Sequence, residues 1–171
     1  MVFRNTTSKD REQVIGLWQK AQAYFKENGI DQWQDGYPNG DTLDADMAGG
    51  ESYVLVDPET EEVLATCFVS FAGEPDYNVI YEGGWMGQEP YGVVHRVAVA
   101  PHRKGQGLAG QLMDHAADLC RENGMKTMRM DTHEDNRSMQ RMFAKNSFEY
   151  RGVIYLGRDG AKRVAFEREL Q

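Results

Sequence analysis

Apolar side chains recur along the chain with two different periods, and the first long stretch has the helical one. Between Thr7 and Gly29 they recur every three to four residues, which predicts an amphipathic helix. Its apolar positions are Val14, Trp18, Ala21 and Phe25. Thr7 and Asp10 have capping-box spacing at its start, and Gly29 is placed to end it. "DTLDADMA", from Asp41, predicts a short second helix.

The rest of the chain alternates β-rich runs with two more helical patterns. Strands are expected at 2–5, 52–57, 63–71, 93–99, 126–131, 148–156 and 163–169. Residues 52–57 and 63–71 are joined by "PETEE", a hairpin signature, whereas a long polar and aromatic loop fills 72–92. The two later helices are expected from Leu108 to a stop at Gly124 and from Asn136 through "NRSMQRMFAKN".

This order, β-α-α-β-β-β-α-β-α-β-β, contains one βαβ crossover, around residues 93–131. The remaining strands follow one another as meanders, and the last two are expected to be antiparallel. We therefore predict a mixed α/β (α+β) domain over residues 1–171, with a mostly antiparallel central sheet and helices on both faces.

Composition narrows the function. The chain has 171 residues, enough for one domain with a proper core, and a formal net charge of −8, which argues against a nucleic-acid partner. Neither a membrane-spanning run nor a secretory leader is recognisable. Cys67 and Cys120 lie inside apolar patterns without ligand-like spacing, so we expect buried thiols, no metal site and a cytoplasmic location.

"PHRKGQGLAGQL", residues 101–112, carries the strongest chemical signal. Gly105, Gly107 and Gly110 have the G-x-G-x-x-G spacing of a dinucleotide-binding turn, and Asp131 lies where a ribose-binding acid would follow. However, an alanine and a four-residue basic loop separate the preceding strand from Gly105, and no doubly wound domain surrounds it. We expect instead that helix-start amides and glycines form a cradle for a pyrophosphate.

Two further segments, "MRMDTHEDN" and "NRSMQRMFAKNSFEYRG", then give a clear resemblance. With "VHRVAVAPHRKGQGLAGQLM", they make the chain resemble the GNAT superfamily of N-acetyltransferases over nearly its whole length. The family's [RQ]-x-x-G-x-[GA] motif corresponds to "KGQGLA", residues 104–109. The resemblance implies a V-shaped splay between the two parallel strands, 93–99 and 126–131, with acetyl-CoA in the cleft.

The family also implies which residues hold this co-substrate. Backbone groups of Val97 and Val99 would pair with the pantetheine arm, and amides from Gly105 to Gly110 would hold the pyrophosphate. The implied set is Val97, Ala98, Val99, Lys104, Gly105, Gln106, Gly107, Leu108, Ala109, Gly110, Asn136, Met139, Phe143 and Lys145. An acceptor amine would attack the thioester while an amide near Val97 stabilises the developing negative charge.

Two departures from the family pattern affect the chemistry. Lys104 replaces the usual arginine or glutamine, so any bidentate contact becomes a point-charge contact, for which Arg103 could compensate. Phe143 stands where many members have the tyrosine that protonates the leaving thiolate. A thiolate with a pKa near about 8.5 can leave without an acid; alternatively, Tyr150 or Tyr155 takes that role.

Two histidines are candidates for the general base. His95 shares strand alternation with Val97 and Val99 if no bulge intervenes, and then faces the reaction centre. His133, at the exit of the next strand, is the second candidate. For both, a purely structural role is the alternative. Arg96, with opposite parity, is expected to support the sheet or to reach another charge.

Two aromatic loops, 30–38 and 77–92, are expected to shape the acceptor site. Their candidate substrate contacts are Trp33, Tyr37, Tyr81, Glu82 and Trp85, through cation–π contact and charge pairing with an amine. Alternatively, these aromatics pin the loops to the core or form a homodimer contact.

Three functions remain open at this point. The first is acetyl transfer from acetyl-CoA to a primary amine of a small molecule or peptide. The second is a non-catalytic sensor that binds an acyl-CoA, with Phe143 marking lost catalysis. The third is an NAD-dependent oxidoreductase, which the fold context disfavours.

Overall fold

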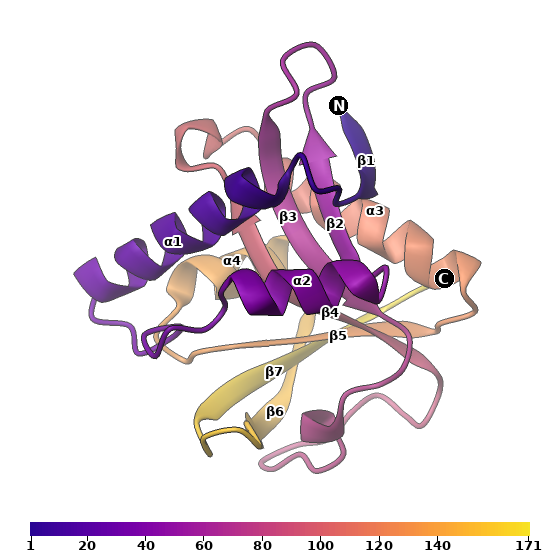
Figure 1. Ribbon diagram of the computed structural model, residues 1–171. Coiled ribbons are helices and arrows are strands. Elements are labelled where there is room, and N and C mark those ends of the chain that lie inside the picture. Colours follow the sequence, from indigo (N-terminus) through magenta and orange to yellow (C-terminus); the bar gives the residue numbers. More distant parts are fainter. The chain divides into compact units, whose positions relative to one another are not determined.

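The computed structural model describes all residues from Met1 to Gln171, and its elements follow the predicted order (Figure 1). The strands are β1 (Val2–Asn5), β2 (Ser52–Val56), β3 (Val63–Ser70), β4 (Tyr91–Val99), β5 (Thr127–Thr132), β6 (Glu149–Tyr155) and β7 (Lys162–Glu169). The helices are α1 (Arg11–Glu27), α2 (Gly40–Ala48), α3 (Leu108–Glu122) and α4 (Arg137–Lys145), with short 3-10 turns η1 (Pro75–Tyr77) and η2 (Pro101–Arg103). No helix is both long enough and apolar enough to span a bilayer.

The seven strands have the order β1-β2-β3-β4-β5-β7-β6, and β4 and β5 are the parallel pair. The predicted mixed sheet and the single crossover, through α3, are therefore confirmed. The chain divides into two compact units, Met1–Val69 with His95–His115 and Ser70–Val94 with Ala116–Gln171. That residues 1–171 form a single domain remains a prediction.

In the first unit, β1, β2 and β3 form an antiparallel meander, and the Ala100 amide after β4 donates to the Leu64 carbonyl (2.8 Å). Both sheet faces are covered. On one face, α1 and α2 lie over β2 and β3 (Figure 1). Their shared core consists of Val14, Leu17, Trp18, Leu43, Val54, Val56, Val63, Ala98 and Ala100. On the other face, the Phe3 ring stacks on Tyr53 and on His115 of α3.

The start of α1 differs from the predicted capping box. The Asp10 carboxylate accepts from the Thr7 amide (2.8 Å), as such a box requires, but the Thr7 hydroxyl donates to the same carboxylate (3.1 Å). Asp10 also receives two hydrogen bonds from the Arg4 guanidinium, at 2.7 and 3.1 Å. The turn is therefore closed by an ion pair, and the regular helix begins later, at Arg11.

In the second unit, β5, β7 and β6 are antiparallel neighbours, and β4 pairs with β5 from Tyr91↔Thr127 to Val93↔Arg129. One face packs on α4, where the Phe143 ring contacts Phe148 and Phe166. The other face is covered by the loop before β4, through a core of Tyr77, Val93, Ile154 and Ala165. Cys67 in the first unit and Cys120 in the second are both buried and free, as predicted.

Candidate functional site

The glycine-rich turn of the first unit has the backbone that the sequence predicts for an anion cradle. Gly105 and Gly107 adopt left-handed conformations (φ 84° and 72°), which disfavour any residue with a Cβ atom. A Cβ added at either position would meet no protein atom within 4 Å, so the space in front of the turn is open. The turn therefore exposes its peptide groups instead of packing them against the core.

The start of α3 supplies hydrogen-bond donors directly after this turn. The Gln111 amide makes the first helical bond, to the Gly107 carbonyl (3.1 Å). The amides of residues 108–110 precede it and have no partner within the helix, as at the start of any α-helix. With the helix dipole, they favour an anion at this end. The donor set and the open glycines thus fit a pyrophosphate.

The basic side chains beside the turn are already engaged by the protein. The His102 ring nitrogen Nε2 lies 2.7 Å from Glu62 Oε1, and Arg103 Nη2 lies 3.4 Å from Glu62 Oε2. The hydrogen bond from Arg103, with that from His102, lowers the pKa of Glu62. The Lys104 ammonium lies 4.5 Å from the centre of the Tyr24 ring on α1. Lys104 therefore points to an aromatic ring of its own chain.

The predicted orientation of His95 assumed regular alternation of side chains along β4. The strand departs from this alternation at Arg96. Arg96 has a left-handed backbone (φ 52°), although it is not glycine. His95 stacks on the Phe68 ring (centroids 5.6 Å apart), and the Arg96 guanidinium lies over the same ring (4.4 Å). The expectation that these neighbours have opposite parity is therefore wrong. His95 as the general base stays a prediction.

Arg96 does reach another charge, as expected. Its Nε and Nη2 each donate to the Asp46 carboxylate of α2 at 2.8 Å, and Nη1 donates to the Tyr37 hydroxyl at 2.6 Å. Both charged side chains are about nine-tenths buried. Burial raises the pKa of Asp46 and outweighs the opposing effect of Arg96. Tyr37, predicted to hold substrate, thus has its hydroxyl engaged by an internal cation.

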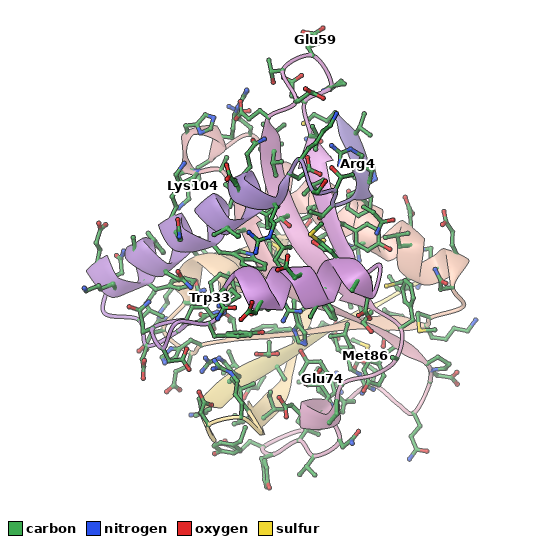
Figure 2. The ribbon with its side chains drawn as sticks, in the orientation of Figure 1. Arg4, Trp33, Glu59, Glu74, Met86 and Lys104 are labelled. Carbon is green, nitrogen blue, oxygen red and sulfur yellow. The ribbon has the colours of Figure 1, made fainter.

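The acceptor-loop residue Trp33 also has an internal contact. Its backbone is left-handed (φ 59°), and its ring packs against the first unit's core and edge-on to Phe25 (5.7 Å). The structure thus places Trp33 as a loop anchor, the alternative that the sequence left open. Figure 2 labels its position.

His133, in the second unit, has a structural hydrogen bond. Its Nδ1 lies 3.0 Å from the Asp135 amide, which can only donate. Nδ1 is therefore unprotonated, and a neutral ring carries its proton on Nε2. That tautomer leaves Nε2 without a lone pair for an incoming proton, which disfavours His133 as the general base.

The cofactor residues predicted around α4 divide by exposure. Phe143 is 0% exposed, which removes its ring from the side chains that a cofactor could touch. Asn136 is buried as the N-cap of α4, where its Oδ1 accepts from the Met139 amide (3.1 Å). Met139 is half-buried and Lys145 exposed, so these two remain accessible. Tyr150, the predicted acid, is 53% exposed, with its ring edge-on to Phe166.

The loop before β4 has accessible and inaccessible aromatics. Tyr81 is 52% exposed and contacts the Tyr155 ring, and Glu82 beside it is exposed. Trp85, in contrast, donates its indole N–H to the Tyr77 carbonyl (2.8 Å). Its ring lies over the Arg129 guanidinium (4.3 Å). Trp85 therefore pins the loop, whereas Tyr81 and Glu82 are free to meet a ligand.

A buried ion pair anchors this same loop, and the sequence analysis missed it. Arg129 Nε donates to Glu167 Oε2 (2.9 Å), and both side chains are almost fully buried. Glu167 also accepts from the Met86 amide (2.6 Å), and Tyr91 covers the guanidinium (3.9 Å). The strand runs 126–131 and 163–169 each contain several charged residues, so the sequence alone does not single out Arg129 and Glu167. Asp131 also has a structural partner, because it accepts from the buried Tyr77 hydroxyl (2.6 Å).

Comparison with known proteins gives a consistent result. Residues 17–148 match the model of the acetyltransferase (GNAT) family. A solved GNAT-family acetyltransferase from Streptococcus agalactiae is 29% identical, with TM-score 0.88 over 99% of this chain and 95% of that one. The uncharacterized N-acetyltransferase YesJ of Bacillus subtilis is 22% identical over 95% of this chain and 86% of its own. A phosphinothricin acetyltransferase from Sinorhizobium meliloti, solved with AcCoA, has TM-score 0.69 at 13% identity, covering 99% of this chain and 88% of that one.

Proposed function

Because the chain belongs to the GNAT family of acetyltransferases, we propose that it transfers the acetyl group of acetyl-CoA to a primary amine of a small molecule or peptide. The observation that carries this proposal is the glycine-rich turn. Its left-handed glycines open onto free space, and helix-start amides follow directly. The family assignment disfavours the nicotinamide alternative. Two free, buried thiols fit the reducing cytoplasm in which we expect the enzyme to act.

When bound, acetyl-CoA supplies an acetyl group activated as a thioester. The amides of Gly105, Gly107 and the first turn of α3 would hold its pyrophosphate, as their conformation allows. Backbone groups of Val97 and Val99 on β4 would orient the pantetheine arm. The Val97 amide would donate to the oxygen on which negative charge develops, which is the main way such a donor lowers a barrier.

Proton transfer falls to side chains of this chain. The acceptor ammonium must lose a proton before it can attack, and His95 on β4 is our candidate base because histidine is the side chain that most often serves as a general base. On the leaving side, Phe143 cannot donate a proton. Tyr150 is our candidate acid, although a thiolate with a pKa near about 8.5 also leaves without one.

The test measures binding and turnover separately. Calorimetric titration with acetyl-CoA measures the cofactor, and release of free CoA thiol in the presence of a panel of primary amines measures transfer. We expect binding together with amine-stimulated CoA release. Tight binding of acetyl-CoA, with no amine that stimulates CoA release, would support the sensor alternative. A rise in melting temperature with NAD but not with acetyl-CoA would refute the proposal.

A matched pair of variants tests the cradle itself. Gly107→Glu places a carboxylate in the turn and should weaken acetyl-CoA binding by about 100-fold or more, through steric block and repulsion. Gly160→Glu is the control, because Gly160 has the same left-handed backbone (φ 73°) and equally open surroundings in the turn between β6 and β7. Both variants carry the same backbone penalty. Equal cofactor affinity in the two would overturn the placement of the pyrophosphate.

A further inference from the structure

Arg96 combines a strained backbone with a side chain held from three sides. Its left-handed φ of 52° lies inside β4, where extended geometry is normal. A non-glycine residue keeps such a conformation only where its surroundings over-determine it. The cause of this conformation must therefore be sought in what holds Arg96.

The holding groups come from three separate elements of the first unit. Asp46 of α2 takes two hydrogen bonds at 2.8 Å, in the bidentate geometry that only arginine offers. Tyr37, in the loop before α2, accepts the third at 2.6 Å. Phe68 of β3 covers the guanidinium face at 4.4 Å. All three guanidinium nitrogens are thus hydrogen-bonded in a nearly dry environment.

The residues on either side of Arg96 are the ones that the proposed reaction needs. His95 precedes it and shares the Phe68 ring with it (5.6 Å). Val97 follows it, and the φ and ψ of a left-handed residue redirect the peptide groups next to it, as in a β-bulge. A change in how Arg96 is held would therefore turn both the base and the amide donor.

We propose that Arg96 is a positioning residue for acetyl transfer, clamped by Asp46 and Tyr37 so that β4 keeps the turn that orients His95 and the Val97 amide. The proposal rests on the proposed function for what these two groups do. The clamp itself is defined by contacts within the first unit and requires no bound ligand.

The kinetic test uses variants that loosen the clamp by different amounts. Arg96→Lys keeps the charge but loses the fork, and Asp46→Asn keeps the shape but loses the charge. We expect both to lower kcat by about 10- to 100-fold, since misplacement by about an ångström has this cost. The KM and the calorimetric Kd for acetyl-CoA should change less than about threefold, because the cradle at residues 105–110 is untouched.

A glycine and alanine pair separates positioning from simple loss of a side chain. Arg96→Gly removes the clamp but adopts a left-handed backbone freely, whereas Arg96→Ala removes the clamp and keeps the steric penalty. We expect kcat to be highest in the wild type, lower in Arg96→Gly and lowest in Arg96→Ala. Asp10→Asn is the matched control, because it breaks another bidentate Arg–Asp pair of the same unit, outside the candidate site.

A spectroscopic readout keeps the outcome independent of turnover. In 15N-labelled protein without cofactor, the Val97 amide resonance should shift in Asp46→Asn, while those of Gly105 and Gly107 stay in place. An unmoved Val97 resonance, or a kcat no lower than that of Asp10→Asn, would overturn the positioning role. If wild type bound acetyl-CoA but acetylated no amine, a shifted Val97 resonance would support the clamp while the proposed function failed.

Discussion

Replacing Glu167 with glutamine should strongly destabilise the second unit. The carboxylate is 0% exposed and accepts from Arg129 Nε (2.9 Å), the Thr127 hydroxyl (2.7 Å) and the Met86 amide (2.6 Å). Glutamine preserves the shape but leaves a buried guanidinium without its counter-charge. It also turns an N–H₂ group toward at least one of these donors.

The magnitude follows from the cost of leaving one charge of a buried pair uncompensated, about 3–5 kcal/mol. The faces of Trp85 and Tyr91 contact the guanidinium before and after the substitution, so these contacts cancel from the difference. We therefore expect a loss of about 3–5 kcal/mol in the free energy of unfolding. For a chain of this length, that lowers Tm by roughly 6–20 °C.

The assay is urea unfolding followed by circular dichroism, with the unfolding free energy of each variant compared at one pH. Glu169→Gln is the control: it removes the same charge from the same strand, two residues further on, at an exposed position. Its effect should stay within about 0.5 kcal/mol. A Glu167→Gln penalty below about 1 kcal/mol, or equal to that of the control, would refute the account of the buried pair.

Two further predictions concern the first unit. Burial would raise the pKa of Asp10, but hydrogen bonds from Arg4 and Thr7 outweigh burial and lower this pKa. The ionised carboxylate therefore stabilises the fold at pH values above its unfolded pKa of about 3.9. This stabilisation is lost as the pH falls through the pKa of the folded state. Asp10→Asn should thus be less stable than wild type at pH 6 but lose less stability between pH 5 and pH 2 in urea unfolding, and equal slopes would contradict this. A double-mutant cycle with Lys104→Met and Tyr24→Leu should give a coupling of about 0.5–1 kcal/mol in the unfolding free energy without cofactor, while Tyr24→Phe keeps this coupling. Zero coupling would contradict a stabilising contact between Lys104 and Tyr24.

Sequence patterns predicted the elements well because most strands here are amphipathic or wholly apolar. The order of all strands and long helices is as expected, and β1 has the expected bounds. Gly105 and Gly107 could be placed in a turn before α3 because their left-handed backbone favours glycine. Local signals were sufficient for these features.

What the sequence could not predict depends on contacts between distant residues. The bulge-like turn at Arg96 has no local signature, since arginine rarely adopts a left-handed backbone, and its cause lies 50 residues away at Asp46. The burial of Phe143 depends on Phe148 and Phe166. The tautomer of His133 depends on a backbone amide two residues on. Each of these changes the candidate site while leaving the fold as predicted.

The Glu62 carboxylate competes with any bound anion for the basic side chains beside the glycine-rich turn. It occupies His102 and Arg103 before any external anion arrives, so a ligand that relied on those cations would first have to displace a carboxylate. A free phosphate ion has fewer acceptor oxygens than a diphosphate and reaches fewer of the turn's amides, so it gains less by that exchange. A diphosphate that spans several peptide amides at once can bind without it, since linked contacts reinforce one another. We therefore expect the turn to discriminate by the number of anchoring points, and to remain available in a cell rich in inorganic phosphate.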